Sequence, residues 1–460
     1  MLKRTPPVIP ALALAIAALK SRLGFAKPQL VLALAPSLPS APAAVSHPVS
    51  HPVSHSASAP TAPQVDHRPA PAPHLRAEDC LSIPVLDQNR DDHACRAAHE
   101  RGQFLARQDR WQDLADEIRA ADANRTATPG GMPIADLLAY GARSDVMLAV
   151  EHALMEGRPP NNAPMVDGII ALEAVRREHP DESVITLIVA LAHIDVGWAW
   201  RGTGWDSVVP KLNRTRCAAH FDRAQHLLAP LCGIELDSPI MAAARCALLA
   251  GQRDPQTRIA DDYEDLIDLD PHNHRHMRAL GNHLLPRWFG TYQQLELEAR
   301  RTASRTQDIW GAGGYTWVCF DAIAVDSQAC AIVDVDFFID GLHDIVTARP
   351  DQAMINLLAA YCSVGLQHDL GQSSVADLPR MQIADCAKWL IRDHLTELHP
   401  MIWAHAADGF DNNSRVTSLA RFAARGQADA LQVIADLFRD DIDRGLRVTF
   451  TPNGPELHPA

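Results

Sequence analysis

Apolar residues recur at helical spacing along the chain after Leu81. They fall three or four residues apart, so the members of each group share one face of a helix. The clearest stripes are Trp111, Leu114, Ala115 and Ile118; Ile169, Leu172 and Val175; and Cys217, Phe221, Ala224 and Leu228. Each stripe predicts a helix that packs on a neighbour. The stretch from Ser183 to Val196 is apolar nearly all round and predicts a helix that is covered on all sides.

Capping and breaking residues mark where these helices start and stop. Ser238-Pro239 supplies an N-cap and a proline for the first turn, Gly251 a stop, and Asp270-Pro271 an end to the next helix. The predicted helices are roughly 12 to 18 residues long and form pairs of roughly 35 to 45 residues, as in helical-repeat proteins. We therefore predict an all-α fold of stacked helical hairpins, a tetratricopeptide-like α-solenoid, over residues 77–445.

The two ends of the chain depart from this pattern. Residues 1–76 are rich in Pro, Ala, Ser and His and predict a disordered tail, because such a composition offers no core. Lys3-Arg4 before the apolar stretch Val8 to Leu19 resembles a secretory signal. Two features argue against this reading: the stretch contains Pro10, and it is shorter than the roughly 20 residues that span a bilayer. Export or membrane anchoring therefore stays an alternative, and a mis-assigned start codon is another. Residues 446–460 predict a short extended C-terminal tail, strand-like only at Arg447 to Phe450.

Charge and cysteine content exclude several classes of protein. The formal net charge is -14 and no dense Lys/Arg run follows residue 77, which excludes nucleic acid as the expected partner. Nine scattered cysteines without a CxxC pair indicate free thiols in a reducing compartment, and neither a disulfide framework nor a zinc site. We expect a cytoplasmic protein without a cofactor, and membrane binding is not expected.

Two clusters of Trp and Arg stand out as candidate binding residues. Trp198 and Arg201 lie at the end of the apolar helix, and Arg287 and Trp288 lie in a turn before the next predicted helix. Trp and Arg dominate the energetics of many protein interfaces, so the four residues predict a partner-binding edge. The alternative is structural, with the tryptophans closing the core and Gly202 or Gly204 ending the helix.

The same two segments carry a family resemblance. Gly197-Trp198-Ala199-Trp200-Arg201-Gly202 resembles an Ala-Trp-x-x-Arg-Gly segment, and Pro286-Arg287-Trp288-Phe289-Gly290-Thr291 resembles a Pro-x-Trp-x-Gly-Ser turn. Both are features of an uncharacterised bacterial helical-repeat family, the domain of unknown function 4034 family, although Gly197 and Thr291 depart from the pattern. The resemblance covers about residues 135–314 and implies a helical-repeat fold, with no activity to transfer.

No catalytic signature is present, and the histidines predict no metal site. His272, His274, His276 and His283 crowd one helix start, but the HExxH pattern is missing, so we expect exposed polar side chains and no metal ion. We find no P-loop and no GxSxG motif. The expected function is therefore a scaffold that binds a protein or peptide on a concave helical surface. The alternatives are an enzyme with a site near the Trp, Arg and His residues, and a self-associating or inhibitory structural protein.

Overall fold

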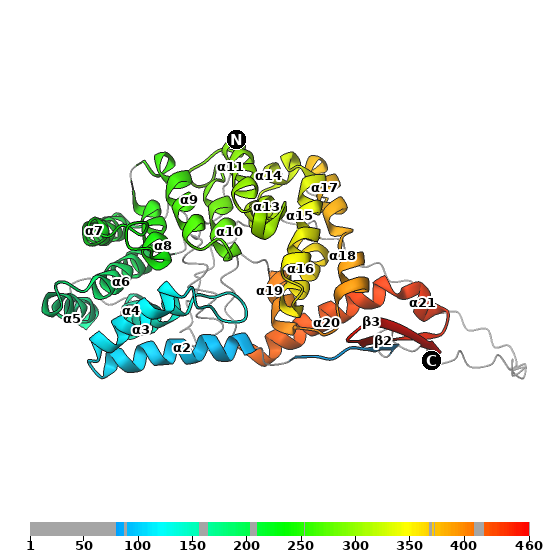
Figure 1. Ribbon diagram of the computed structural model, residues 1–460, viewed down its shortest axis with the longest axis horizontal. Helices are drawn as coiled ribbons and strands as arrows, with labels where there is room; N and C mark the ends of the chain where they lie inside the picture. Colours follow the sequence, from blue (N-terminus) through cyan, green and yellow to red (C-terminus); the bar gives the residue numbers. More distant parts are fainter. Residues whose placement is uncertain are drawn as a thin grey trace, which may run out of the picture.

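The protein is mostly helical. The computed structural model describes residues 80–86, 90–155, 164–202, 209–252, 254–367, 370–371, 373–408 and 418–459. The predicted tail, residues 1–76, lies outside these described residues. The helices follow one another along an arc (Figure 1).

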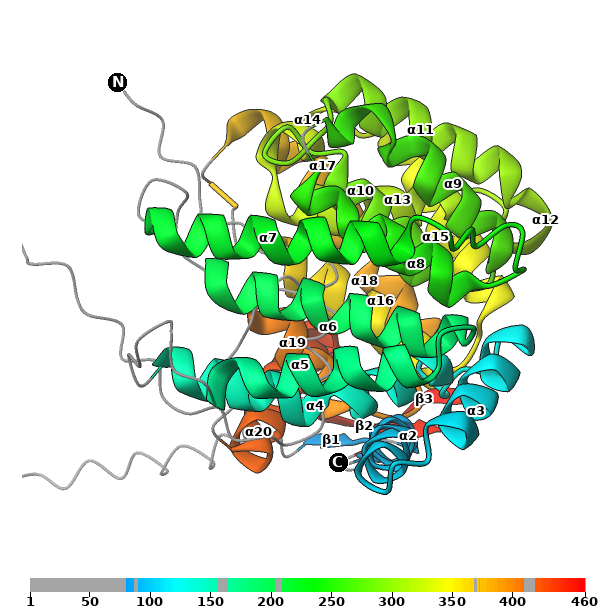
Figure 2. The same ribbon diagram turned by 90° about the vertical axis from the view of Figure 1, so that its left-hand side faces the viewer.

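The first half of the arc is built around a main hydrophobic core, with two smaller clusters of buried residues beside it. Its helices are α2 (Arg90–Arg107), α3 (Trp111–Ala123), α4 (Ile134–Met155), α5 (Pro164–Glu178), α6 (Ser183–Arg201), α7 (Lys211–Leu228) and α8 (Pro239–Leu248). The predicted stripe of α3, from Trp111 to Ile118, is buried in this core. Figure 2 shows α4, α6 and α7 side by side, in agreement with the contacts between these helices. The predicted helical stripes therefore pack as expected in this half.

The second half surrounds a larger core. Its longer helices are α9 (Ile259–Leu269), α10 (His274–His283), α11 (Tyr292–Arg305), α13 (Gly313–Val325), α15 (Val335–Ala348), α16 (Gln352–Ser363), α17 (Ser374–Ala384), α19 (Pro400–Asp408) and α20 (Leu419–Leu437). Three short helices lie between them, namely α12 (Gln307–Trp310), α14 (Ser327–Ile332) and α18 (Ala387–Trp389), and a fourth, α21 (Arg439–Asp443), follows α20. A π-helical turn at Leu390–His394 precedes the loop before α19. Three tryptophans, Trp310, Trp317 and Trp403, are fully buried here and supply much of the apolar area.

Side-chain caps fix where several of these helices begin. Ser238 accepts a hydrogen bond from the amide of Met241 and starts α8, as predicted. Asp334 and Asp351 cap α15 and α16 in the same way. Because each cap satisfies an amide that the helix leaves unpaired, the turns between helices are well defined.

Helix α6 is buried along most of its length, as the sequence predicts. It is also long and apolar enough to cross a membrane by composition, but 83% of that apolar stretch is buried inside the protein. It is the one such helix among the described residues. A helix that is buried in the core of a protein can have the same length and apolar composition as one that crosses a membrane.

The C-terminal residues correct one prediction. Residues 446–460 were expected to be a short extended tail, but β2 (Leu446–Thr451) and β3 (Gly454–Pro459) form an antiparallel hairpin. The strand-like pattern at Arg447 to Phe450 is confirmed by β2. Gly454 has a φ of 106°, which suits glycine and lets the chain return directly after β2. The hairpin then buries Val448 and Phe450 against the core of the second half.

The hairpin joins the two ends of the described chain. β1 (Leu81–Ser82) pairs in parallel with β2, with Leu81 opposite Val448. Beside it, Leu86 N donates to Leu398 O (2.9 Å) and Leu398 N donates to Pro84 O (2.8 Å). We call these contacts the closure. The arc of helices therefore meets itself at the sheet, where β2 lies between β1 and β3; all three strands are labelled in Figure 2.

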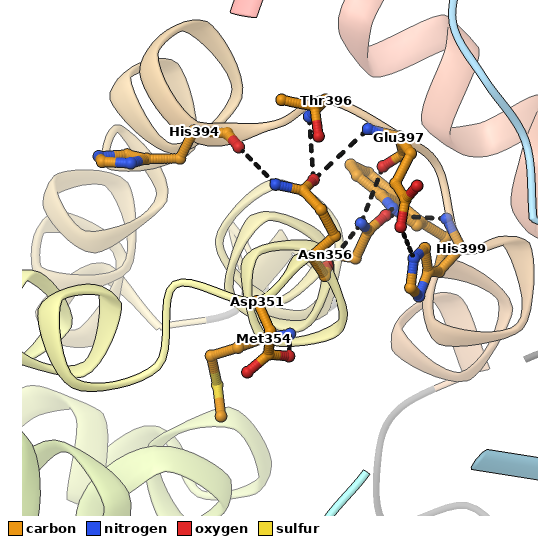
Figure 3. A network of polar contacts seen from close by, with 9 residues as sticks. Asp351, Met354, Asn356, His394, Thr396, Glu397 and His399 are labelled. Carbon is orange, nitrogen blue, oxygen red and sulfur yellow. Dashed lines mark hydrogen bonds and ion pairs between the residues drawn. The ribbon is translucent and has the colours of Figure 1, made fainter. Parts of the chain in front are cut away.

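A buried amide holds the loop that carries Leu398 (Figure 3). Asn356 of α16 is fully buried; its Nδ2 donates to Glu397 O (3.0 Å), and its Oδ1 accepts from His399 N (3.0 Å) and Trp403 Nε1 (2.9 Å). Gln352, one turn earlier, accepts from Thr396 N (2.9 Å) and donates to His394 O (2.8 Å). These two side chains give the backbone N–H and C=O groups of the loop the hydrogen-bond partners that a helix or sheet would otherwise supply.

Candidate functional site

A cavity of about 420 Å³ lies between segments that are far apart in the sequence. It is lined by the end of α3 and the loop before α4, the start of α8, the turn between α9 and α10, and Arg349 at the end of α15. We call it the interloop pocket. Its volume falls within the range of small-molecule sites, which is roughly 300–1,000 Å³.

The loop before α4 is held in place from α2. The buried carboxylate of Asp91 accepts a hydrogen bond from the Thr128 hydroxyl and another from Gly130 N (2.7 Å). Thr128 Oγ1 in turn accepts from Met132 N (3.1 Å). One buried carboxylate thus orients this wall of the pocket.

Two arginines tie this loop to the turn between α9 and α10. Arg125 Nε donates to Leu269 O (3.2 Å), and its guanidinium also pairs with Asp237. Arg275 Nη2 donates to Gly130 O (3.1 Å). Because these bonds join segments well over a hundred residues apart, the shape of the pocket does not depend on one loop alone.

The acidic residues of the pocket wall are already engaged. Asp122 accepts from Ile240 N (3.0 Å) and from the Ser238 hydroxyl, and burial raises the pKa of its carboxyl. Asp270 is paired with His276 Nε2 (3.2 Å) and Asn273 Nδ2 (3.0 Å). Burial raises the pKa of Asp270, but these two hydrogen bonds, together with the charges of His276 and Arg125, lower it overall. Both carboxylates therefore act as structural acceptors.

One further carboxylate close to these two groups has a strongly shifted pKa. Asp136 follows the lining residue Ala135, and burial raises its pKa to about 6, opposed mainly by the charge of His276. The neighbouring negative charges of Asp122 and Asp270 raise the pKa further. Asp136 therefore changes its charge close to neutral pH, unlike an ordinary aspartate.

The first predicted pair of binding residues is placed together at the end of α6. The guanidinium carbon of Arg201 lies 5.8 Å from the ring centre of Trp198, and Trp198 packs edge-on against Phe221 (5.6 Å between ring centres). Both predicted residues are half-buried, and Trp198 packs against the core of the first half. Trp198 thus has the structural role that was one alternative from the sequence, while the half-buried pair still leaves an edge that a partner could contact.

The second predicted pair, Arg287 and Trp288, lies next to a buried histidine. Trp288 lies edge-on to His283 (5.8 Å between ring centres), and Phe289 stacks on the same histidine (5.6 Å). His283 Nδ1 is 2.7 Å from the hydroxyl of Tyr263. Burial and then the charge of Arg287 lower the pKa of His283 to about 4, which keeps the ring neutral. Trp288 also contacts Phe289 (5.5 Å between ring centres), which packs on the core of the second half, whereas Trp198 packs on the core of the first half. Trp198 and Trp288 therefore lie beside different cores.

The expectation that the clustered histidines are exposed is wrong for His274 and His283, which are buried. His274 packs against Trp317 at 4.3 Å between ring centres, which gives an uncharged imidazole an apolar place in the core. His272 is exposed at the rim of the interloop pocket. Within the described residues, no group of three or more His, Cys, Asp or Glu side chains is placed to hold a metal ion.

The three most exposed large apolar side chains among the described residues lie on α17. Val375, Leu378 and Met381 are 66%, 63% and 60% exposed and lie three residues apart. Ala376 and Ile383, on the opposite face of α17, are buried in the core. We call the three exposed side chains the α17 face. Sequence reasoning missed it because three apolar residues at this spacing look the same whether a helix turns them inward or outward.

No protein-family model matches the chain, and no curated protein or solved structure is significantly similar to it. The resemblance to the domain of unknown function 4034 family therefore stays a prediction from two short segments.

Proposed function

We propose that the protein is a scaffold that binds a partner protein through the α17 face. The observation that carries this proposal is the row of three large apolar side chains, each more than half exposed, on one side of a helix whose other side is firmly packed. An apolar surface of this kind is typical of a site that another protein covers. The tetratricopeptide-like array expected from the sequence would serve as the rigid support for this helix.

The energy available from this face suits a specific interaction. Burying one such side chain completely stabilises a complex by about 1.5–3 kcal/mol. Covering the exposed part of all three gives about 3–5 kcal/mol before the costs of association. Each tenfold change in a dissociation constant corresponds to about 1.4 kcal/mol, so this contribution changes the constant by two to four powers of ten.

The partner surface that fits is the apolar side of a basic amphipathic helix. A helix presents residues three and four apart on one side, which matches the spacing of Val375, Leu378 and Met381. The formal net charge of -14 favours a partner with cationic residues around its apolar stripe, because opposite charges steer association.

A Leu/Lys peptide of about 17 residues, with leucines at helical spacing, tests the proposal directly. Its binding is measured by fluorescence anisotropy against a scrambled peptide of the same composition. Leu378→Ser should weaken binding about tenfold, since it removes roughly 1.4 kcal/mol or more of apolar contact. Leu297→Ser is the matched control, because Leu297 is also exposed (47%) on a helix but lies on α11.

Equal binding of the scrambled peptide, or equal loss in both variants, would refute the α17 face as the site. The same two variants are then compared by affinity capture from the native host. The proposal requires that a captured protein is lost with Leu378→Ser and retained with Leu297→Ser.

The edge predicted from sequence, formed by Trp198, Arg201, Arg287 and Trp288, remains a second candidate surface for the same function. Its support is the half-exposed stacking of Arg201 on Trp198.

A further inference from the structure

The interloop pocket has a charge pattern that the proposed scaffold function does not use. Four proline rings, from Pro129, Pro133, Pro239 and Pro271, line it together with Ala121 and Ala135. Proline carries no N–H donor, so these walls offer mainly apolar contact. The polar contacts for a ligand must come from the other lining residues, of which Asp122, Arg125, Asp270 and Arg349 are charged.

Most of those charged residues are already committed to the protein. Asp122 and Asp270 accept hydrogen bonds from neighbouring groups, and Arg125 is bonded to Asp237 and to three backbone carbonyls. These residues fix the walls, and their charges are largely compensated by the neighbours that they bind.

Arg349 is different. Its Nε donates to Asp351 (2.9 Å), which orients the guanidinium, and its side chain is 33% exposed. Among the described residues, its two terminal nitrogens make no further hydrogen bond. A guanidinium that is anchored on one side and open on the other presents its remaining donors in the planar arrangement that a carboxylate accepts.

We propose that the interloop pocket binds an organic carboxylate with a short apolar group, and that Arg349 holds the carboxylate. The apolar group lies among the proline rings, and the single negative charge lies at the guanidinium. A phosphate fits less well, because it brings up to two negative charges close to Asp122 and Asp270. A free small acid and the C-terminal residue of a peptide share this chemistry. The site is separate from the α17 face.

The test measures binding of 3-phenylpropionate to the full chain by ligand-observed NMR, with 3-phenylpropionamide as the uncharged counterpart. We expect the acid to bind at least tenfold more tightly than the amide. N-acetyl-Ala-Leu, with a free or an amidated C-terminus, distinguishes a peptide ligand from a small acid. Inorganic phosphate is the competing anion.

Three variants locate the effect. Arg349→Gln removes the charge and should weaken binding of the acid at least tenfold. Ala127→Trp leaves Arg349 intact but fills the pocket from an exposed lining position, and should abolish binding. Arg110→Gln is the matched control, since Arg110 also has one carboxylate partner, Asp113, but lies at the far end of α3 from the pocket. Circular dichroism confirms that each variant is folded.

Several results would overturn the proposal. The first is equal binding of acid and amide, and the second is unchanged binding in Arg349→Gln or in Ala127→Trp. The third is tighter binding of phosphate than of the acid. The fourth is no binding of either carboxylate probe up to about 10 mM, which would mean a binding free energy weaker than about 3 kcal/mol.

Discussion

Replacing Asn356 by alanine removes the side chain that holds the loop of the closure. The variant leaves three buried groups without partners, namely the carbonyl of Glu397, the amide of His399 and the indole N–H of Trp403. The carbonyl of Gln352, which Asn356 also contacts, keeps its partner within α16. Each buried group that loses its partner costs about 1–3 kcal/mol, so we expect a loss of about 4 kcal/mol in the free energy of unfolding.

The loss is measured by urea unfolding, followed by circular dichroism and by tryptophan fluorescence. A domain is typically stable by only about 5–15 kcal/mol, so a change of this size is easily resolved. Asn124→Ala is the control, because Asn124 is exposed and makes one side-chain hydrogen bond, to Ala120 O. That variant should lose about 0.5 kcal/mol.

A local measurement separates the role of Asn356 in the closure from a general loss of stability. Hydrogen exchange at the amides of Leu86 and Leu398 should accelerate in the variant under native conditions, because both amides bond across the closure. A loss below about 1 kcal/mol, or unchanged exchange at these two amides, would show that the network in Figure 3 does not support the closure.

Four further substitutions test other parts of the structure. Burial raises the pKa of Asp136 to about 6, above the roughly 3.9 of an unfolded chain, so stability falls as pH rises between these values. Asp136→Asn should therefore be more stable than the parent by about 2–3 kcal/mol at pH 7.5 and by only about 0.5 kcal/mol at pH 4. Equal stability of the two proteins at both pH values would contradict the assignment. Gly281→Ala places a Cβ 1.7 Å from Val318 O and should cost about 3 kcal/mol in urea unfolding; a cost under 1 kcal/mol would mean that α10 and α13 adjust easily. Trp198→Ala should lower stability by about 2 kcal/mol and Arg201→Ala by about 0.5 kcal/mol in thermal melts, and the reverse order would argue against the packing at the end of α6.

The positions of many helices could be predicted from the sequence because their signals are local. The cap at Ser238, the proline after it and the apolar stripe of α3 each lie within a few residues, and the structure confirms them. The burial of α6 was also predictable, since a helix that is apolar all round has no side to turn to water.

The closure and the interloop pocket could not be predicted in this way. Leu81 meets Val448 from the other end of the described chain, and a strand of two residues leaves almost no periodic signal. Arg349 and Asp270 meet at the pocket only because the arc brings α15 and the turn after α9 together. The choice between core and surface for the apolar residues of α17 likewise depends on which neighbours the fold provides.

The closure also limits how this protein can change in length. In an open array each helical hairpin contacts mainly its neighbours, so whole hairpins are gained or lost with little effect on the rest. Here a deleted or inserted hairpin would alter the arc and move Leu81 away from Val448. We therefore expect length differences among related chains to fall in the turns between helices, with the number of helices between β1 and β2 held constant.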